Sequence, residues 1–173
     1  MPSYTIRPAT LRDAGTIASI HAHFSEGLAA NPPPAASSKP SRADTGLDFW
    51  REAIEYGEPQ LQVAVTPDNK VIGFVGYDRS RDAGTKPTVG ELWAIYVLPP
   101  YWDTGAGLAL WDAAREGLQD EGCTQVTVWL PLRSERALRF HALAGFKHEL
   151  NSARTVAVDG VRVEEIRLKR ASA

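Results

Sequence analysis

The residues best suited to chemistry follow an apolar stretch in the middle of the chain. Positions 96–110 read Tyr-Val-Leu-Pro-Pro-Tyr-Trp-Asp-Thr-Gly-Ala-Gly-Leu-Ala-Leu. An apolar strand, two prolines, a turn with two glycines and the start of a helix thus follow one another. Such a turn presents backbone N–H groups and a helix N-terminus to an anion, with no side chain to block close approach. A diphosphate is the group that fits it.

Two known phosphate-binding patterns do not match this turn. A dinucleotide fingerprint needs a third glycine three residues after Gly107, and Leu110 stands there. A P-loop needs a Gly-Lys-Ser/Thr triplet, and the sequence has none.

The segment instead resembles the acetyl-CoA-binding motif of the GCN5-related N-acetyltransferases. That motif is Val-x-Pro followed by Arg/Gln-x-x-Gly-x-Gly/Ala. Val97 and Pro99 match its first part, and Gly105 and Gly107 match its second part. Trp102 departs from it, because the family usually has arginine or glutamine there. The resemblance implies that acetyl-CoA is bound mainly by main-chain groups between Leu98 and Leu110, with these cofactor candidates: Val97, Leu98, Pro99, Trp102, Asp103, Thr104, Gly105, Ala106, Gly107 and Leu108.

A second segment strengthens the resemblance. Positions 134–146 read Ser-Glu-Arg-Ala-Leu-Arg-Phe-His-Ala-Leu-Ala-Gly-Phe and look like the family pattern Asn-x-x-Ala-x-x-Phe-Tyr-x-x-x-Gly-Phe. Ser134 replaces the asparagine that usually touches the pantetheine arm, so it is a further cofactor candidate. A serine before Glu135 equally suits the N-cap of a helix, and we favour that interpretation.

Acetyl transfer to an amine requires groups that accept and donate protons more than it requires a protein nucleophile. By resemblance, the amine attacks directly in a ternary complex, and a backbone N–H near positions 95–97 stabilises the oxyanion. Cys123 is then expected to be a buried small hydrophobe rather than a nucleophile.

Two side chains are candidates for proton transfer. His141 stands where the family usually has its tyrosine acid, and an imidazole titrates near neutral pH; the alternative is a histidine that only packs. Glu91 lies on a strand whose positions 91, 93, 95 and 97 should share one apolar face. A carboxylate there needs a partner or a task, and in several family members it is the base; the alternative is a strand end that reaches solvent.

The sequence gives fewer indications of which residues bind the acceptor amine. His21 lies on the apolar face of the first predicted helix, which borders the acceptor in this family, and it is a substrate candidate together with Trp50 and Glu91. A core role for His21 is the competing interpretation. Arg42 and Arg51 leave room for an acceptor that carries a carboxylate.

Hydrophobic periodicity and turn residues predict the helices and strands that would position these residues. Thr10 and Asp13 resemble a capping box at the start of the first helix. Positions 31–45 hold four prolines and predict a loop. Strands are expected at 4–7, 61–65, 71–77, 89–98, 124–130, 153–158 and 161–168, and helices at about 14–24, 49–56, 107–121 and 135–143. The Pro-Asp-Asn turn after 61–65 and the Asp159-Gly160 turn each predict a hairpin. The fold class is α+β: a mixed, mostly antiparallel sheet of about seven strands flanked by about four helices.

Composition limits the other possibilities. A chain of 173 residues fits one domain, 1–173, and its 19 basic against 21 acidic residues give a net charge of -2, which disfavours nucleic-acid binding. We expect no metal site, no membrane span and no signal peptide, hence a cytoplasmic protein. The expected function is N-acetyl transfer from acetyl-CoA to a small-molecule primary amine, by an enzyme for which both a monomer and a homodimer fit the sequence. The alternative is a catalytically idle module of the same fold that binds CoA or a metabolite.

Overall fold

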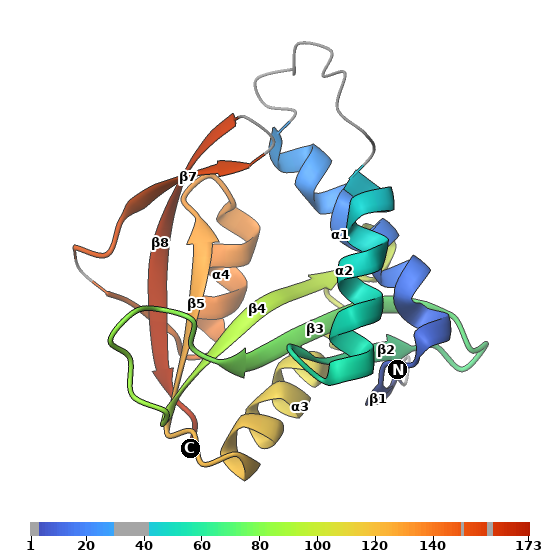
Figure 1. Ribbon diagram of the computed structural model, residues 1–173, viewed down its shortest axis with the longest axis horizontal. Coiled ribbons are helices and arrows are strands. Elements are labelled where there is room, and N and C mark those ends of the chain that lie inside the picture. The colour runs from blue at the N-terminus through green and yellow to red at the C-terminus, as the bar shows by residue number, and fades with distance from the viewer. Residues whose placement is uncertain (1–3, 30–41, 150, 159–160) are drawn as a thin grey trace. The chain divides into compact units, whose positions relative to one another are not determined.

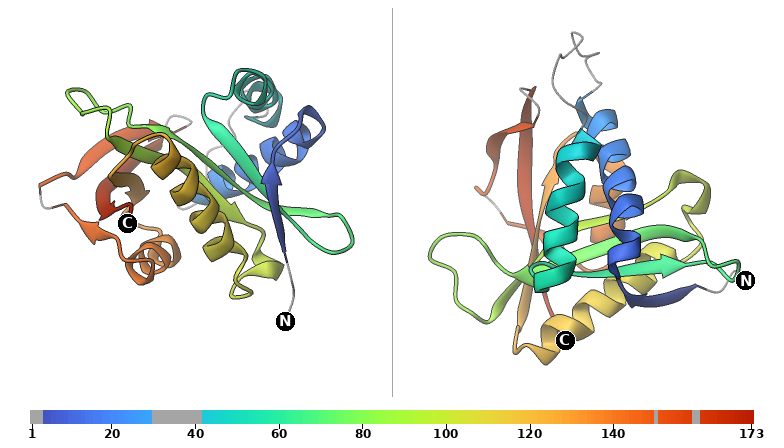
Figure 2. Two further views of the ribbon diagram at one scale, coloured as in Figure 1. Left: turned by 90° about the horizontal axis from the view of Figure 1, so that it is seen from below. Right: turned by 45° about the vertical axis from the view of Figure 1, so that its right-hand side comes forward.

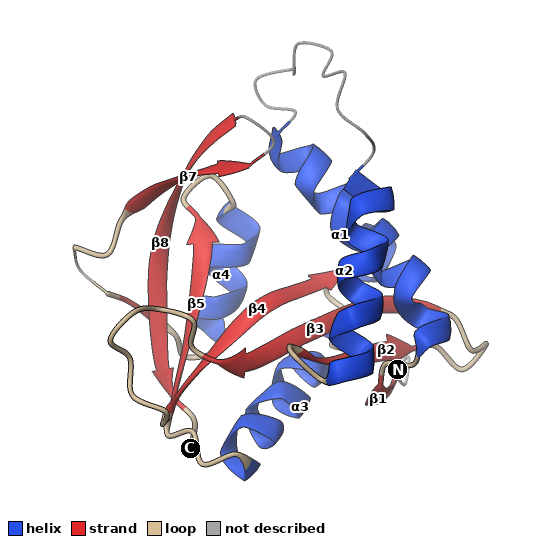
Figure 3. Ribbon diagram, viewed as in Figure 1, coloured by secondary structure: helices blue, strands red, loops and turns tan. Residues whose placement is uncertain are grey.

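The computed structural model describes residues 4–29, 42–149, 151–158 and 161–173. Figure 1 shows the chain order, and Figure 3 separates helices from strands. The helices are α1 (Ala14–Ala29), α2 (Arg42–Tyr56), α3 (Ala106–Asp120) and α4 (Glu135–Leu143), with short 3-10 turns at Leu11–Asp13 and Pro99–Tyr101. The strands are β1 (Thr5–Pro8), β2 (Gln60–Val65), β3 (Val71–Arg79), β4 (Val89–Val97), β5 (Gln125–Pro131), β6 (Lys147–His148), β7 (Arg154–Val158) and β8 (Val161–Ala171).

These strands form a mixed sheet in the order β1-β2-β3-β4-β5-β8-β6, and β7 also pairs with β8. The β4–β5 pair is parallel, whereas β1–β2, β5–β8, β6–β8 and β7–β8 are antiparallel. The predicted α+β class, with four helices and a mostly antiparallel sheet, is confirmed. The count in the described residues is eight strands, because the two-residue β6 carries little sequence signal.

The chain divides into two compact units. Unit 1 comprises Met1–Gly76 and Ala94–Ala114, and unit 2 comprises Tyr77–Trp93 and Arg115–Ala173. The strands β3 and β4 and the helix α3 each continue from one unit into the other. The expectation that residues 1–173 form one domain stays a prediction.

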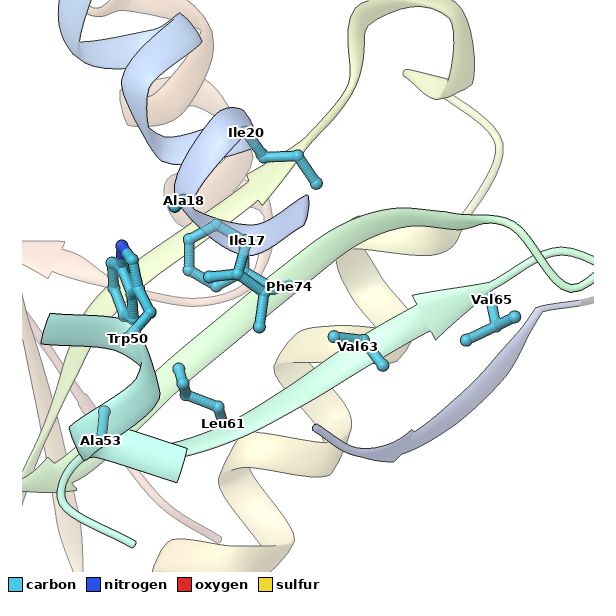
Figure 4. Packing of buried hydrophobic residues seen from close by; sticks show 10 residues of the cluster. Ile17, Ala18, Ile20, Trp50, Ala53, Leu61, Val63, Val65 and Phe74 are labelled. Atoms are coloured by element: carbon cyan, nitrogen blue, oxygen red, sulfur yellow. The ribbon is translucent and has the colours of Figure 1, made fainter. Parts of the chain in front are cut away.

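Unit 1 is built around two helices that lie side by side on β2 and β3 (Figures 1 and 2). Their inward faces repeat every three to four residues, as expected for helices with one buried stripe. Figure 4 shows this core, in which Ile17, Trp50 and Phe74 pack against one another. The predicted apolar face of the first helix is confirmed, since Ala14, Ile17 and Ala18 are buried.

The start of α1 is held by an acidic side chain. The carboxylate of Asp13 accepts hydrogen bonds from the Thr10 backbone N–H at 2.7 Å and from the Thr10 hydroxyl at 3.2 Å. It also binds both terminal nitrogens of Arg7, at 2.8 and 3.2 Å. The capping interaction predicted from this spacing is therefore present in its carboxylate half, and it ties β1 to the helix.

Unit 2 is organised by β8, whose residues 165–171 pair with β5, while 161–165 pair with β7 and 168–169 pair with β6. The hairpin predicted at Asp159-Gly160 is confirmed by the pairing of Val158 with Val161, although the two turn residues lie outside the described part. One buried side of the unit is apolar and includes Val126, Val128 and Leu168.

Strand β4 carries one residue more than the neighbouring part of β3. The Ser80 N–H donates to the Val89 carbonyl, and the Leu98 N–H donates to the Ile72 carbonyl. Between these two bonds β3 runs over positions 80 to 72 while β4 runs over positions 89 to 98. A strand with one unmatched residue contains a β-bulge.

The side chains of β4 agree with this bulge. A Cβ atom on Gly90 would lie 2.7 Å from Leu118 of α3. A Cβ atom on Gly73 would lie 3.3 Å from Leu110 of α3 and 3.2 Å from Val97. Positions 90 and 97 thus both face α3, which strict alternation forbids. The expectation that residues 91, 93, 95 and 97 share one face is therefore wrong, because the bulge reverses the alternation between them.

One further correction concerns α2. The predicted loop at 31–45 ran too far, because α2 begins at Arg42 rather than near Phe49. The last proline of that segment is Pro40, and no residue from 42 to 56 is a proline, so helix geometry is permitted throughout. Residues 31–41 lie outside the described part of the chain.

Candidate active site

The candidate cofactor site is the turn that leads from β4 into α3, entirely within unit 1. Asp103 has a φ of 62° and Gly105 a φ of 90°, so two left-handed residues alternate with right-handed or extended ones. In proteins, such an alternation turns successive N–H groups toward one side and creates sites for anions. The helix α3 then starts at Ala106, and its first N–H groups have no carbonyl one turn earlier to bind.

Glycine at position 105 is required by the backbone rather than by space. No heavy atom lies within 4 Å of a Cβ placed there, but a φ of 90° is strained for any residue with a side chain. The turn is open to ligands, because Asp103, Gly105 and Leu108 are all exposed.

Trp102 ties the turn to the end of β4. Its indole Nε1–H donates to the carbonyl of Val97 at 2.7 Å, which closes the segment between the end of β4 and the turn. The side chain is half-buried. The residue that departs from the family pattern therefore has a structural task of its own.

Thr104 is held from two directions. Its hydroxyl donates to the Tyr101 carbonyl at 2.5 Å and accepts from the phenol of Tyr4 at 2.8 Å. Tyr4 precedes β1 and lies 100 positions away in the sequence, so no local pattern indicates this bond. The hydroxyl of Thr104 is engaged within the protein, which leaves its backbone amide for a ligand.

Glu91, the candidate base, lies in unit 2 and is buried, with 2% of its surface exposed. Arg81 binds it through the backbone N–H at 3.0 Å, Nε at 3.4 Å and Nη2 at 2.5 Å. The guanidinium carbon also lies 3.7 Å from the ring centre of Trp93. Glu91 thus has the partner that a buried carboxylate needs, and sequence analysis had not singled out Arg81.

The other candidate for proton transfer, His141, is 2% exposed and lies on α4 in unit 2. Its Nδ1 lies 2.8 Å from the carbonyl oxygen of Ala137. Because a carbonyl can only accept, Nδ1 carries the proton and Nε2 is an unprotonated acceptor. Within the described residues Nε2 has no hydrogen-bond partner. Burial lowers the pKa of His141, and the bond to Ala137 offsets this only in part, so the ring is neutral at pH 7.

The candidate acceptor residues of unit 1 lie together. The ring of His21 lies edge-on to Trp50 at 5.4 Å and to Tyr96 at 5.8 Å between centroids. Tyr96 stacks on Phe24 at 4.6 Å. His21, Phe24 and Tyr96 are half-buried, whereas Trp50 is part of the core. His21 is therefore set in an aromatic cluster next to the end of β4.

Ser134 stands at the N-cap position of α4, as predicted, but its hydroxyl makes no capping bond. With a ψ of 78° its backbone departs from the extended geometry usual at an N-cap, so the side chain is not aimed at the helix amides. Our preference for a capping role is corrected on this point. Cys123 is buried, and burial raises the pKa of its thiol, which agrees with a packing role.

Two other kinds of site are not found in the described residues. Three or more His, Cys, Asp or Glu side chains nowhere gather in a way that could hold a metal ion within that part of the chain. Among the described helices, none combines the length and apolar character needed to span a membrane.

Comparison with known proteins identifies the family. The family model described as "Acetyltransferase (GNAT) family" matches residues 26–146. An uncharacterised N-acetyltransferase of Mycobacterium tuberculosis is 30% identical over 146 residues, which cover 84% of this chain and 88% of that protein. The chain therefore belongs to the GNAT acetyltransferase family, and the resemblance found in its motifs is confirmed.

Solved structures share the fold at low sequence identity. An N-acetyltransferase from Staphylococcus aureus superposes with a TM-score of 0.76 at 17% identity, covering 99% of both chains. A phosphinothricin acetyltransferase from Sinorhizobium meliloti, solved in complex with acetyl-CoA, gives a TM-score of 0.73 at 20% identity, covering 97% of this chain and 88% of the other.

Proposed function

We propose that this acetyltransferase uses acetyl-CoA to acetylate a primary amine of a small molecule, by direct attack in a ternary complex. The observation that carries the proposal is the turn from β4 to α3. Its left-handed residues Asp103 and Gly105 and the unpaired first amides of α3 form a seat for a diphosphate. The Sinorhizobium structure with acetyl-CoA supports the choice of ligand.

Acetyl transfer forms a C–N bond, breaks the C–S bond of the thioester, and moves one proton from the amine to the departing thiolate. No covalent enzyme intermediate is needed. We assign the oxyanion to backbone N–H groups near the end of β4, close to the bulge. Bulges often occur next to active sites because they redirect backbone groups.

For proton transfer we propose His141 and Glu91. Neutral His141 has an unprotonated Nε2, so in this proposal it takes up there the proton that the attacking amine loses and delivers it to the thiolate. Glu91 forms an ion pair with Arg81 at 2.5 Å, and in this proposal it acts as base through water on the amine. His21 and Trp50 are proposed acceptor contacts in the aromatic cluster. A cytoplasmic location and a homodimer also remain proposals.

One observation favours the second candidate, an idle module that binds acetyl-CoA without turnover. The candidate base Glu91 is already bound by Arg81, and Nε2 of His141, the nitrogen that would carry the proton, is buried. A fold that retains the cofactor turn but keeps these groups from the reactants would bind and not react.

A binding test and a turnover test separate the two. The thermal midpoint is measured with saturating acetyl-CoA, and with ATP and NADH as controls. Ligand at about 100 times its Kd stabilises by about 2.7 kcal/mol, which is a rise of roughly 5–11 °C for a chain of this size. Thiol release is then followed with a panel of primary amines, and acetylated products are identified by mass spectrometry. A shift with acetyl-CoA alone followed by thiol release supports the enzyme; a shift without release on any amine supports the idle module; no shift overturns both.

A further inference from the structure

The cofactor turn is held by side chains that come from outside the motif. Tyr4 donates its phenol proton to the Thr104 hydroxyl at 2.8 Å, and that hydroxyl donates to the Tyr101 carbonyl at 2.5 Å. On the other side of the turn, the Trp102 indole donates to the Val97 carbonyl at 2.7 Å. We call these three bonds the turn brace. All of them lie within unit 1.

The direction of the bonds in the Tyr4–Thr104–Tyr101 chain is fixed by chemistry. A carbonyl oxygen can only accept, so the Thr104 hydroxyl donates its single proton to Tyr101. The remaining bond must then be donated by Tyr4. Hydrogen bonds in such a chain polarise and strengthen one another. The hydroxyl of Tyr4 therefore acts on the turn through Thr104.

A turn of this shape needs outside support. Asp103 takes a left-handed conformation that residues with a side chain rarely adopt, and it is exposed, so the core does not impose that conformation. Main-chain amides bind a diphosphate well only when they are already aligned, because ordering a loose loop on binding reduces affinity. Every bond that keeps the free turn in its bound shape therefore tightens ligand binding.

We propose that Tyr4 is a positioning residue for acetyl-CoA: through the hydroxyl of Thr104 it holds the turn from 101 to 105 in the anion-binding conformation, and Trp102 holds the same turn from β4. The inference rests on the proposed cofactor but concerns residues that the motif does not contain. It also assigns a role to the Thr104 side chain, which supports the turn and does not bind the ligand.

The test is a double-mutant cycle of Tyr4→Phe and Thr104→Val, with acetyl-CoA affinity measured by calorimetry. Tyr4→Phe removes one hydroxyl and keeps the ring, and Thr104→Val keeps the shape of the side chain. Because one hydrogen bond contributes roughly 0.5–1.5 kcal/mol, each single variant should bind acetyl-CoA about 2- to 10-fold more weakly. Because Tyr4 acts through Thr104, the double variant should be no weaker than Thr104→Val alone.

Kinetics distinguish positioning from general destabilisation. KM for acetyl-CoA should rise in the Tyr4→Phe variant, while kcat at saturating acetyl-CoA and KM for the amine stay unchanged. The control is Tyr56→Phe, the same chemical change at a residue that is 72% exposed at the end of α2, and it should alter none of these values. Unchanged acetyl-CoA affinity in Tyr4→Phe, or additive losses in the double variant, would overturn the inference.

A second measurement does not depend on the cofactor. Amide hydrogen exchange at 103–108 in the free protein should be several-fold faster in Tyr4→Phe than in the natural sequence. If the natural protein fails to bind acetyl-CoA, the proposed function is rejected. Faster amide exchange in Tyr4→Phe would still show that the hydroxyl of Tyr4 holds the turn in the natural protein. If exchange in the variant is unchanged, the inference is rejected whatever the ligand.

Discussion

The carboxylate of Asp103 stands in the middle of the turn that we propose for a diphosphate. It is exposed and its φ is 62°, a conformation that glycine adopts without strain. Replacing Asp103 with glycine removes both the like charge and the backbone strain. We expect Asp103→Gly to bind acetyl-CoA several-fold more tightly, measured by calorimetry.

Asp103→Asn separates the two effects. Asparagine tolerates a left-handed conformation and carries no charge, so it should reproduce the part of the gain in affinity that comes from charge. That part should shrink as salt is raised, because exposed charges are screened. A gain cannot come from misfolding, so weaker or equal binding by Asp103→Gly would show that the carboxylate does not oppose the ligand.

Glu91 is either the catalytic base or only an anchor for Arg81, and one variant distinguishes these two roles. Glu91→Gln keeps the shape and the hydrogen-bond acceptor but cannot take a proton. If Glu91 is the base, kcat on the best amine should fall by about 100-fold or more, with acetyl-CoA affinity unchanged. If the carboxylate only anchors Arg81, kcat should stay within a few-fold and the variant should lose about 1–3 kcal/mol of stability, because a buried ionic hydrogen bond is weakened.

At the scale of the elements, β3 and α3 approach each other closely in unit 2. A Cβ atom on Gly117 of α3 would lie 2.5 Å from the hydroxyl oxygen of Tyr77 and 2.7 Å from its ring. Alanine normally stabilises a helix by about 1 kcal/mol relative to glycine. At Gly117 we expect the opposite sign, a loss of about 1–3 kcal/mol, because the buried Tyr77 must move.

Gly15 provides the matched control on α1. It is exposed, and no heavy atom lies within 4 Å of a Cβ placed there. Gly15→Ala should therefore stabilise the protein by about 0.5–1 kcal/mol. Denaturant unfolding of both variants gives the comparison, and a Gly117→Ala variant that gains stability like Gly15→Ala would mean that Tyr77 does not pack on α3 this closely.

The sequence predicts most elements because their signals are local. Hydrophobic periodicity places the helices, and the Pro-Asp-Asn and Asp-Gly turns place two hairpins, with ends within a few residues of the observed ones. The start of α2 is the exception. Prolines in the preceding segment dominate the local composition and hide a helix whose own residues permit it.

Features set by partners far along the chain could not be predicted. The bulge in β4 depends on the register of β4 with β3, and no residue type in β4 predicts it. The partner of Glu91 is Arg81, ten positions away across a loop, and the partner of Thr104 is Tyr4. The candidate cofactor turn was therefore found from sequence, whereas the contacts that support it and the bonding state of both candidate proton carriers required the structure.

On the scale of the whole molecule, the pair Arg7–Asp13 makes stability depend on pH. Burial of Asp13 raises its pKa, but the hydrogen bonds from Arg7 and Thr10 and the charge of Arg7 outweigh this, so the pKa of Asp13 is lower in the folded protein than its ordinary value. A group with a lowered folded pKa stabilises the protein above its unfolded pKa, near 4, and this contribution is lost as the pH falls through the folded pKa.

Urea unfolding at pH 6 should therefore find the natural sequence more stable than Asp13→Asn, and the difference should shrink below about pH 4, where the carboxylate starts to take up a proton. A difference that stays constant down to pH 2.5 would show that the charge of Asp13 contributes nothing, and that its shape and hydrogen bonds alone hold the start of α1.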